Sequence, residues 1–107
     1  MSAAKIRELN DRFRSTMTGG RVVMTAGVDA LPSDVKAMVI RRVATFTDFN
    51  AENDPHAEHD FGSFPLGGQK FFFKLDYYDS TMTYGSEDPS DPSKTTRVLT
   101  IMLAEEY

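Results

Sequence analysis

Residues 59–79, HDFGSFPLGGQKFFFKLDYYD, contain two extended runs separated by a pair of glycines, Gly67 and Gly68. Paired glycines between alternating runs are typical of a β-hairpin, because glycine readily adopts the backbone angles of a tight turn. Successive side chains of a strand point to opposite faces, so the second run divides into two sets. The set predicted to face the core is Phe71, Phe73, Leu75 and Tyr77, and the opposite set is Phe72, Lys74, Asp76 and Tyr78.

The first half of the chain has the periodicity of helices instead. Apolar residues recur at spacings of three and four from Ile6 to Met17, with charged residues between them, which predicts an amphipathic helix over residues 3–17. Pro32 suits a first helical turn, and the residues after it predict a second helix over residues 32–47. The side chains expected on its apolar face are Val35, Met38, Val39, Val43 and Phe46.

Three shorter segments complete the predicted fold. Residues 21–28, RVVMTAGV, are rich in β-branched side chains and predict a strand that ends at the glycine of this segment. Residues 80–85 predict a third antiparallel strand beside the hairpin. Residues 95–107 predict a closing helix, with Asp91 as its N-cap and Pro92 in its first turn. The side chains expected to point inward from this helix are Val98, Leu99, Met102 and Leu103.

This order of elements predicts an α+β fold, in which a small antiparallel sheet of three to four strands has about three helices packed on one face. At 107 residues the chain is expected to form a single domain, residues 1–107, because typical domains contain roughly 100–150 residues. A chain of this size can bury about two-thirds of its unfolded surface, which is enough for a core without covalent cross-links.

Charge is unevenly distributed along the chain. The net charge is −4, but residues 1–50 carry +3 and residues 51–107 carry −7. Nucleic-acid binders usually need a basic surface, so direct nucleic-acid binding is not expected. The absence of cysteine excludes disulfides, thiolate ligands and a cysteine nucleophile. No segment approaches the roughly 20 apolar residues that cross a bilayer, so we expect no membrane association and a cytoplasmic location.

The stretch that most suggests chemistry is residues 52–60, ENDPHAEHD. His56 and His59 could approach one metal ion if the segment were a helical turn, with Asp54 or Asp60 adding an oxygen ligand. A structural zinc site generally needs four ligands, and a catalytic one needs three plus water. A metal or a nucleotide phosphate bound by His56, His59 and Asp60, in a binding protein or a small hydrolase, is therefore one hypothesis.

Local backbone preferences favour a different reading of this stretch. Pro55 disfavours the helical conformation at Asp54. The alternation after it predicts a strand starting near His59, and residues three apart in a strand point to opposite faces. The two imidazole rings would then diverge. The favoured interpretation is a polar loop in which Asn53 and Asp54 accept hydrogen bonds from their own backbone.

Three aspartates precede prolines, in Asp54-Pro55, Asp88-Pro89 and Asp91-Pro92. The carboxylate can accept from backbone amides while proline fixes the next torsion, so each pair predicts a stiff corner. Such corners also hold negative charge in a fixed place. The residues expected to form a preorganised acidic patch are Asp76, Asp79, Glu87, Asp88 and Asp91, and a patch of this kind could meet the basic groove of a nucleic-acid enzyme.

Phe72 and Tyr78 lie on the opposite face of the predicted hairpin from the core. If helices cover one face only, these two aromatic side chains are exposed beside Asp76 and Tyr84. They could then stack a nucleotide or anchor a protein interface. The alternative is that the segment packs on both of its faces.

Four stretches of the chain resemble a bacterial family known as the domain of unknown function three-seven-six-eight. They are TGGRVVMTAGVDALP, FNAENDPHAEHDFGSF, FFFKLDYYD and TYGSEDPSDPSKTTRVLTIMLAEEY, in the same order as in the family. Members are similar small proteins carried largely on plasmids, integrated elements and phages. The resemblance implies an accessory role in a mobile element, often exercised by binding host defence machinery, and it assigns no catalytic residue.

These observations favour a non-enzymatic interaction protein of a mobile element that binds a host, nucleic-acid-processing protein, for example as an anti-defence inhibitor. No cofactor is expected, and the partner's identity and the oligomeric state are left open. The residues expected to contact the partner are Asp54, His56, Glu58, Asp60, Tyr78, Asp79, Tyr84, Glu87, Asp88 and Asp91.

Overall fold

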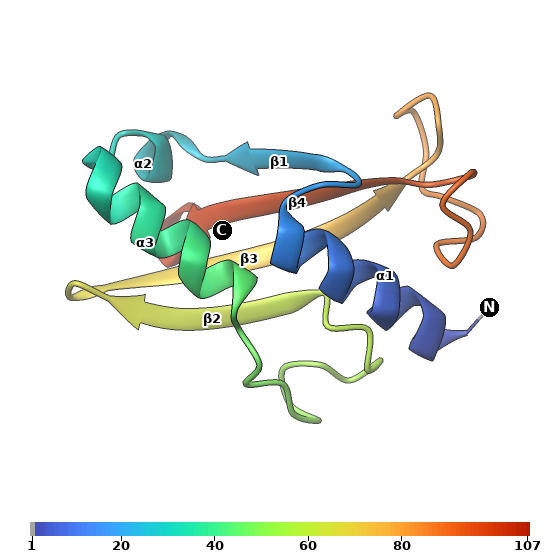
Figure 1. Cartoon of the computed structure of the whole chain (residues 1–107), viewed down its shortest axis with the longest axis horizontal. Coiled ribbons are helices and arrows are strands. Elements are labelled where there is room, and N and C mark those ends of the chain that lie inside the picture. The colour runs from blue at the N-terminus through green and yellow to red at the C-terminus, as the bar shows by residue number, and fades with distance from the viewer. Residues whose placement is uncertain (1) are drawn as a thin grey trace.

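The computed structural model describes residues 2–107, in which two long helices lie on one face of a four-stranded sheet (Figure 1). Helix α1 spans Ala3–Thr16 and helix α3 spans Ser33–Ala44, so both predicted helices are confirmed. A one-turn helix, α2 (Ala26–Asp29), places Val28 in the core. Within residues 2–107, no helix is both long and apolar enough to cross a membrane.

Local signals explain where α1 begins and ends. The side chain of Ser2 caps the helix, because its Oγ accepts a hydrogen bond from the backbone N–H of Lys5 at 3.3 Å. Met17 adopts a left-handed conformation at φ 58° and its N–H donates to the carbonyl of Phe13. In α3 the expected apolar face is correct for Val39 and Val43, which are fully buried, but wrong for Met38, which is 48% exposed.

The sheet has the strand order β1-β4-β3-β2. Its strands are β1 (Arg21–Met24), β2 (Phe61–Leu66), β3 (Gln69–Tyr78) and β4 (Thr96–Leu103), and a short 3-10 helix, η1 (Ala104–Glu106), follows β4. Strand β1 runs parallel to β4, while the other pairs are antiparallel. The α+β class, the strand number and the layer of helices on one face are confirmed, and the sheet is mixed rather than wholly antiparallel.

The β2–β3 hairpin has the predicted position and register. Gly67 and Gly68 form its turn at φ 59° and 82°, angles that glycine adopts without steric cost. Phe71 and Phe73 are buried beneath the helices, as expected for the core-facing set. The opposite set lies on the sheet face that no long helix covers (Figure 1).

The prediction of a closing helix over residues 95–107 is wrong, because this segment forms β4, an interior strand of the sheet. Leu99 and Ile101 face the helices, while Val98 and Met102 lie on the opposite face and are also buried. A strand buried on both faces is apolar along most of its length. Over a short run, this pattern cannot be distinguished from the spacing of a buried helix.

Three smaller predictions also need correction. Asp91 and Pro92 do not begin a helix, since they lie in the loop that precedes β4. Residues 80–85 form no third strand, and only an isolated bridge joins Tyr78 to Gly85. The predicted strand over 21–28 ends earlier, at Met24, because α2 begins two residues later.

Gly62 marks a close approach between the hairpin and the segment after α3. A Cβ at this position would lie 2.6 Å from Cε1 of Phe46 and would also clash with the ring of Phe73. We expect Gly62→Val to lower the free energy of unfolding by about 2 kcal/mol, because a close-packed core resists extra volume. Urea denaturation measures this. The same side chain placed on the uncovered face, in Ser63→Val, should change stability by less than about 0.5 kcal/mol; equal losses would contradict the assignment.

Candidate functional site

A buried amide connects the helical layer to the sheet. Asn10 of α1 is fully buried, and its Nδ2 donates to the carbonyl of Glu58 at 3.0 Å and to Oη of Tyr77 at 2.8 Å. Its Oδ1 accepts from Nε of Arg97 at 2.8 Å. The hydroxyl of Tyr77 in turn donates to the Glu58 carboxylate at 2.8 Å. We refer to Asn10, Glu58, Tyr77 and Arg97 as the polar hub.

The polar hub holds two long loops at the same end of the sheet. Residues 45–60, the histidine loop, are held through Glu58. Residues 79–95, the acidic loop, are held because the Arg97 guanidinium donates to the carbonyl of Pro89. Burial lowers the pKa of Arg97 and raises that of Tyr77. Buried polar groups of this kind are stabilising only while their hydrogen bonds are satisfied.

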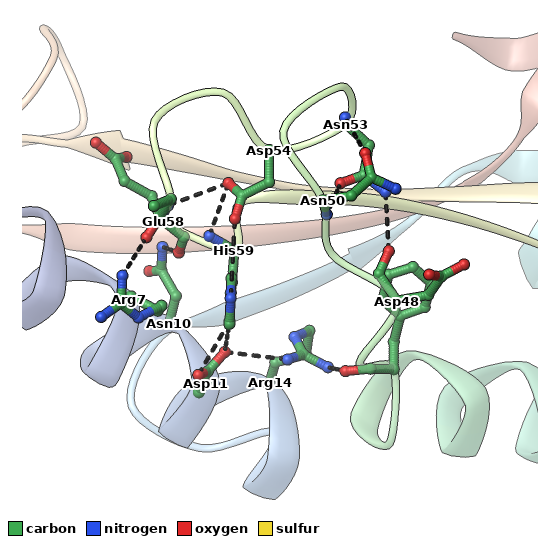
Figure 2. A network of polar contacts seen from close by, with 12 residues as sticks. Arg7, Asn10, Asp11, Arg14, Asp48, Asn50, Asn53, Asp54, Glu58 and His59 are labelled. Atoms are coloured by element: carbon green, nitrogen blue, oxygen red, sulfur yellow. Dashed lines mark hydrogen bonds and ion pairs between the residues drawn. The ribbon is translucent and has the colours of Figure 1, made fainter.

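His59 is clamped between α1 and its own loop (Figure 2). Its Nδ1 lies 2.9 Å from Oδ1 of Asp11, and its Nε2 lies 3.8 Å from Oδ2 of Asp54. The ring stacks on Phe49 with 3.9 Å between centroids and 4° between planes. Asp54 is buried, and its Oδ1 also accepts the backbone N–H groups of Glu58 and His59, each at 3.1 Å. The imidazole therefore holds the loop in place.

The structure contradicts the placement of His59 in the predicted strand and confirms the predicted polar loop. Strand β2 starts at Phe61, and His59 precedes it in a left-handed conformation at φ 56°, so the expected strand does not orient the two rings. The polar loop is confirmed, because Oδ1 of Asn53 accepts from the N–H of Asn50 at 2.9 Å and Asp54 accepts as described above. Within the described chain, residues 2–107, no three histidine or carboxylate side chains are placed to hold a metal ion.

A second buried cation lies beside the histidine. Arg14 donates to the carbonyls of Val43 and Phe46, at 2.7 and 2.9 Å, and to Oδ1 of Asp11 at 3.1 Å. Burial lowers its pKa, although the ion pair with Asp11 opposes the shift. The last carbonyls of a helix attract cations, so Arg14 serves as a side-chain cap for α3. A shallow hollow of about 400 Å³ beside it is lined by His59 and Phe46, among others.

Sequence reasoning missed the α1 residues that build this region. Asn10 lies four residues after Ile6 and three before Phe13, which puts it on the apolar stripe of the helix. A polar side chain on such a stripe indicates a buried hydrogen-bonding role. The stripe identifies Asn10 but not its partners, since Glu58, Tyr77 and Arg97 come from distant parts of the chain.

The acidic loop is ordered by its own carboxylates. Oδ1 of Asp79 accepts from the backbone of Thr81 and Thr83, at 3.2 and 3.0 Å. Asp91 makes the same kind of turn, accepting from N and Oγ of Ser93 at 2.9 and 2.7 Å, and Asp88 does so with Ser90. These hydrogen bonds hold the pKa of each aspartate below its usual range. Each predicted stiff corner in this loop is therefore also a fixed negative charge.

The residues expected to contact a partner fall into two groups. Tyr78, Asp79, Tyr84, Glu87, Asp88 and Asp91 lie on or beside the acidic loop, where the N–H of Asp79 donates to the carbonyl of Tyr84 at 2.8 Å. In the histidine loop, Asp54 and Glu58 direct their carboxylates inward, whereas His56 is exposed. Asp60 is partly buried, and burial together with the nearby charge of Glu58 raises its pKa.

The chain is thus a small α+β protein in which a polar hub holds two long loops at one end of a mixed sheet. The model of the family described as "Protein of unknown function (DUF3768)" matches residues 24–106, and the chain belongs to this family. No curated protein and no solved structure matches the chain.

Replacing Asn10 tests the polar hub. Asn10→Ala leaves the buried Arg97 Nε without its acceptor, so we expect the free energy of unfolding to fall by about 2–3 kcal/mol. Urea denaturation gives the value. Glu8→Ala is the matched control, because Glu8 is exposed on the same helix and should change stability by less than about 0.5 kcal/mol. A loss for Asn10→Ala no larger than that of the control would show that the hub is not stabilising.

Carboxyl titration followed by NMR tests the turns of the acidic loop. Because the folded-state pKa of Asp79 and Asp91 is lowered, their hydrogen bonds stabilise the fold fully above about pH 4 and are lost as the pH falls through the lowered values. Ser93→Ala should move the pKa of Asp91 toward its usual range and leave that of Asp79 unchanged. An unchanged Asp91 titration would refute the assigned cause.

Proposed function

We propose that this protein is a non-enzymatic interaction protein that binds another protein through the acidic loop, residues 79–95. One observation carries the proposal: Tyr84 is 74% exposed in a loop whose neighbouring carboxylates are already fixed by hydrogen bonds. Exposed tyrosines on ordered loops are frequent energetic anchors of interfaces, because the ring buries a large area at a small entropic cost.

The charge of the acidic loop favours a basic partner. Asp79, Glu87, Asp88 and Asp91 are opposed only by Lys94, which gives residues 79–95 a net charge of −3. The pKa of each of the three aspartates is lowered by its turn hydrogen bonds, so these carboxylates stay ionised to a lower pH than an ordinary aspartate. Fixed charges of one sign accelerate docking to an oppositely charged surface and orient it, and they do so without the entropic cost of ordering the side chains.

Hydrogen bonds from the sheet also hold the acidic loop in place. The Arg97 guanidinium holds Pro89, and the N–H of Ser86 donates to the carbonyl of Tyr77 at 3.0 Å. The hydroxyl of Ser86 lies 2.7 Å from that of Thr95, which joins the middle of the loop to its end. A recognition loop that is ordered before binding retains more of its interaction energy as affinity.

For the biological role, we propose that the partner is a host protein and that the chain acts as an accessory factor of a mobile element. The resemblance to plasmid- and phage-borne proteins supports this role. A nucleic-acid-processing enzyme of host defence fits the chemistry, since its phosphate-binding groove is basic and would accept a negatively charged loop. Blocking such a groove would inhibit the enzyme without any catalytic group on this chain.

The test compares capture of host proteins by the tagged wild-type chain and by two variants that differ in where charge is removed. The loop variant combines Glu87→Gln, Asp88→Asn and Asp91→Asn, and the two asparagines retain the side-chain oxygens that accept the turn hydrogen bonds. Its partner should associate at least about tenfold more slowly than with wild type, and wild-type association should slow with added salt. Quantitative mass spectrometry identifies the partner, and surface plasmon resonance with the purified partner gives the rates.

The control variant removes three charges elsewhere, by Glu8→Gln, Asp34→Asn and Glu52→Gln. It should bind as wild type does. Tyr84→Ala should weaken binding through a faster dissociation rate, because it removes the proposed anchor and not the charge. Wild-type rates for the loop variant, with unchanged thermal stability in all three proteins, would refute the acidic loop as the recognition surface.

A further inference from the structure

The two long helices leave the other face of the sheet uncovered (Figure 1), and this face carries an aromatic cluster. Phe61 and Phe72 lie 5.2 Å apart between ring centroids on neighbouring strands, and the ring of Tyr107 packs edge-on against both, at 6.1 and 5.6 Å. Tyr107 is 76% exposed, and Val23 at the other side of the same face is 46% exposed. We call this surface the open face.

We propose that the open face is where a second copy of this chain docks, so that two sheets pack face to face in a weak dimer. This inference is independent of the acidic loop as a recognition surface. Sheets that pack in this way form a common two-layer arrangement, and a two-fold interface requires one surface to be complementary to itself. The arrangement of charges on the open face meets that requirement.

The charges of the open face occupy its two ends in opposite order. At the hairpin end, Lys70 of β3 and Glu105 beyond β4 line one hollow. At the other end, Asp76 of β3 and Arg21 of β1 both pair with Val98, so they lie in one row across the sheet. From the hairpin end to the other end, the charge on β3 changes from positive at Lys70 to negative at Asp76. On the side of β4 and β1 it changes from negative at Glu105 to positive at Arg21.

Consider a two-fold axis that lies in the interface and runs across the strands. It lays each strand of one copy over the same strand of the second copy, running in the opposite direction. This operation places Lys70 of one copy over Asp76 of the other, and it brings Arg21 over the end that holds Glu105. It also brings Phe72 opposite Lys74 of the second copy, whose ammonium pairs with Asp76 of its own chain at 3.1 Å. An axis parallel to the strands would instead lay β3 of one copy over β4 of the other, with Lys70 over the end of β4 that leads to Glu105. The contact between Lys70 and Asp76 forms only with the axis that runs across the strands, so this contact distinguishes the two arrangements.

The edges of the sheet offer a poorer route to association. Strand β2 contains Pro65, which has no N–H to donate to an added strand. Strand β1 has only four residues, and a short edge strand is a poor template for pairing. The open face instead offers apolar side chains, among them Val23, Phe72 and Tyr107.

The size of the open face sets the strength of the dimer. Four strands about 4.8 Å apart and eight residues of β4 at about 3.3 Å each give about 500 Å² per copy, or about 1,000 Å² buried in total. This lies at the lower limit for specific interfaces. We therefore expect a dissociation constant on the order of tens of micromolar.

Sedimentation equilibrium of the full chain over a concentration series tests the proposal. The average mass should rise from 12.0 kDa towards twice that value. Lys70→Glu and Asp76→Lys should each weaken self-association by at least about tenfold, because each creates two like-charge contacts in the symmetric dimer. An equimolar mixture of the two variants should recover the wild-type affinity, since every contact between unlike copies is then attractive.

Arg41→Glu is the control, because Arg41 is exposed on α3, on the helical side of the sheet, and carries the same charge change. It should dimerise as wild type does. Circular dichroism of each variant establishes that the fold is retained. A mass of 12.0 kDa at every concentration, equal weakening by Arg41→Glu, or no recovery in the mixture would each overturn the proposal.

Discussion

The hydrogen bonds of one buried amide determine how the layers of this protein are joined. Asn10 reaches from α1 to strands β3 and β4 and to the histidine loop, and every polar atom of its side chain has a partner. A buried polar group adds little to the free energy of unfolding when all its hydrogen bonds are made, but it lowers that free energy strongly when a partner is missing. It therefore acts mainly on specificity: of the ways in which an amphipathic helix could lie on this sheet, one satisfies Asn10, Tyr77 and Arg97 together.

The same constraint gives the two long loops a common support. The histidine loop is held by Glu58, by the buried carboxylate of Asp54 and by the contact between His59 and Asp11. The acidic loop is held through Arg97. Loops that carry binding residues usually depend on a rigid scaffold for their geometry, and here the scaffold extends into the loops themselves. The histidines, which suggest chemistry when the sequence is considered alone, take a structural part in this arrangement through His59.

What the sequence could predict was local. The periodicity of α1 and α3 and the paired glycines of the hairpin are signals contained within about 20 residues, and all three elements were placed correctly. Strand β4 was missed because its burial on both faces depends on neighbours that the local pattern does not contain. The parallel pairing of Arg21 with Val98 is likewise non-local. At the site, the turns at Asp88 and Asp91 followed from Asp-Pro pairs, whereas the partners of Asn10 required the fold.

Charge and side-chain geometry have separable roles in the acidic loop. Each aspartate at a turn uses one oxygen to accept hydrogen bonds from its own loop, and asparagine offers the same acceptor. The shape of the loop depends on that acceptor, while the proposed attraction to a basic partner depends on the negative charge. Replacing these aspartates with asparagine thus removes the negative charge and retains the hydrogen-bond acceptor. Because these aspartates belong to neither the polar hub nor the core, we expect their charge to be replaceable without loss of the fold.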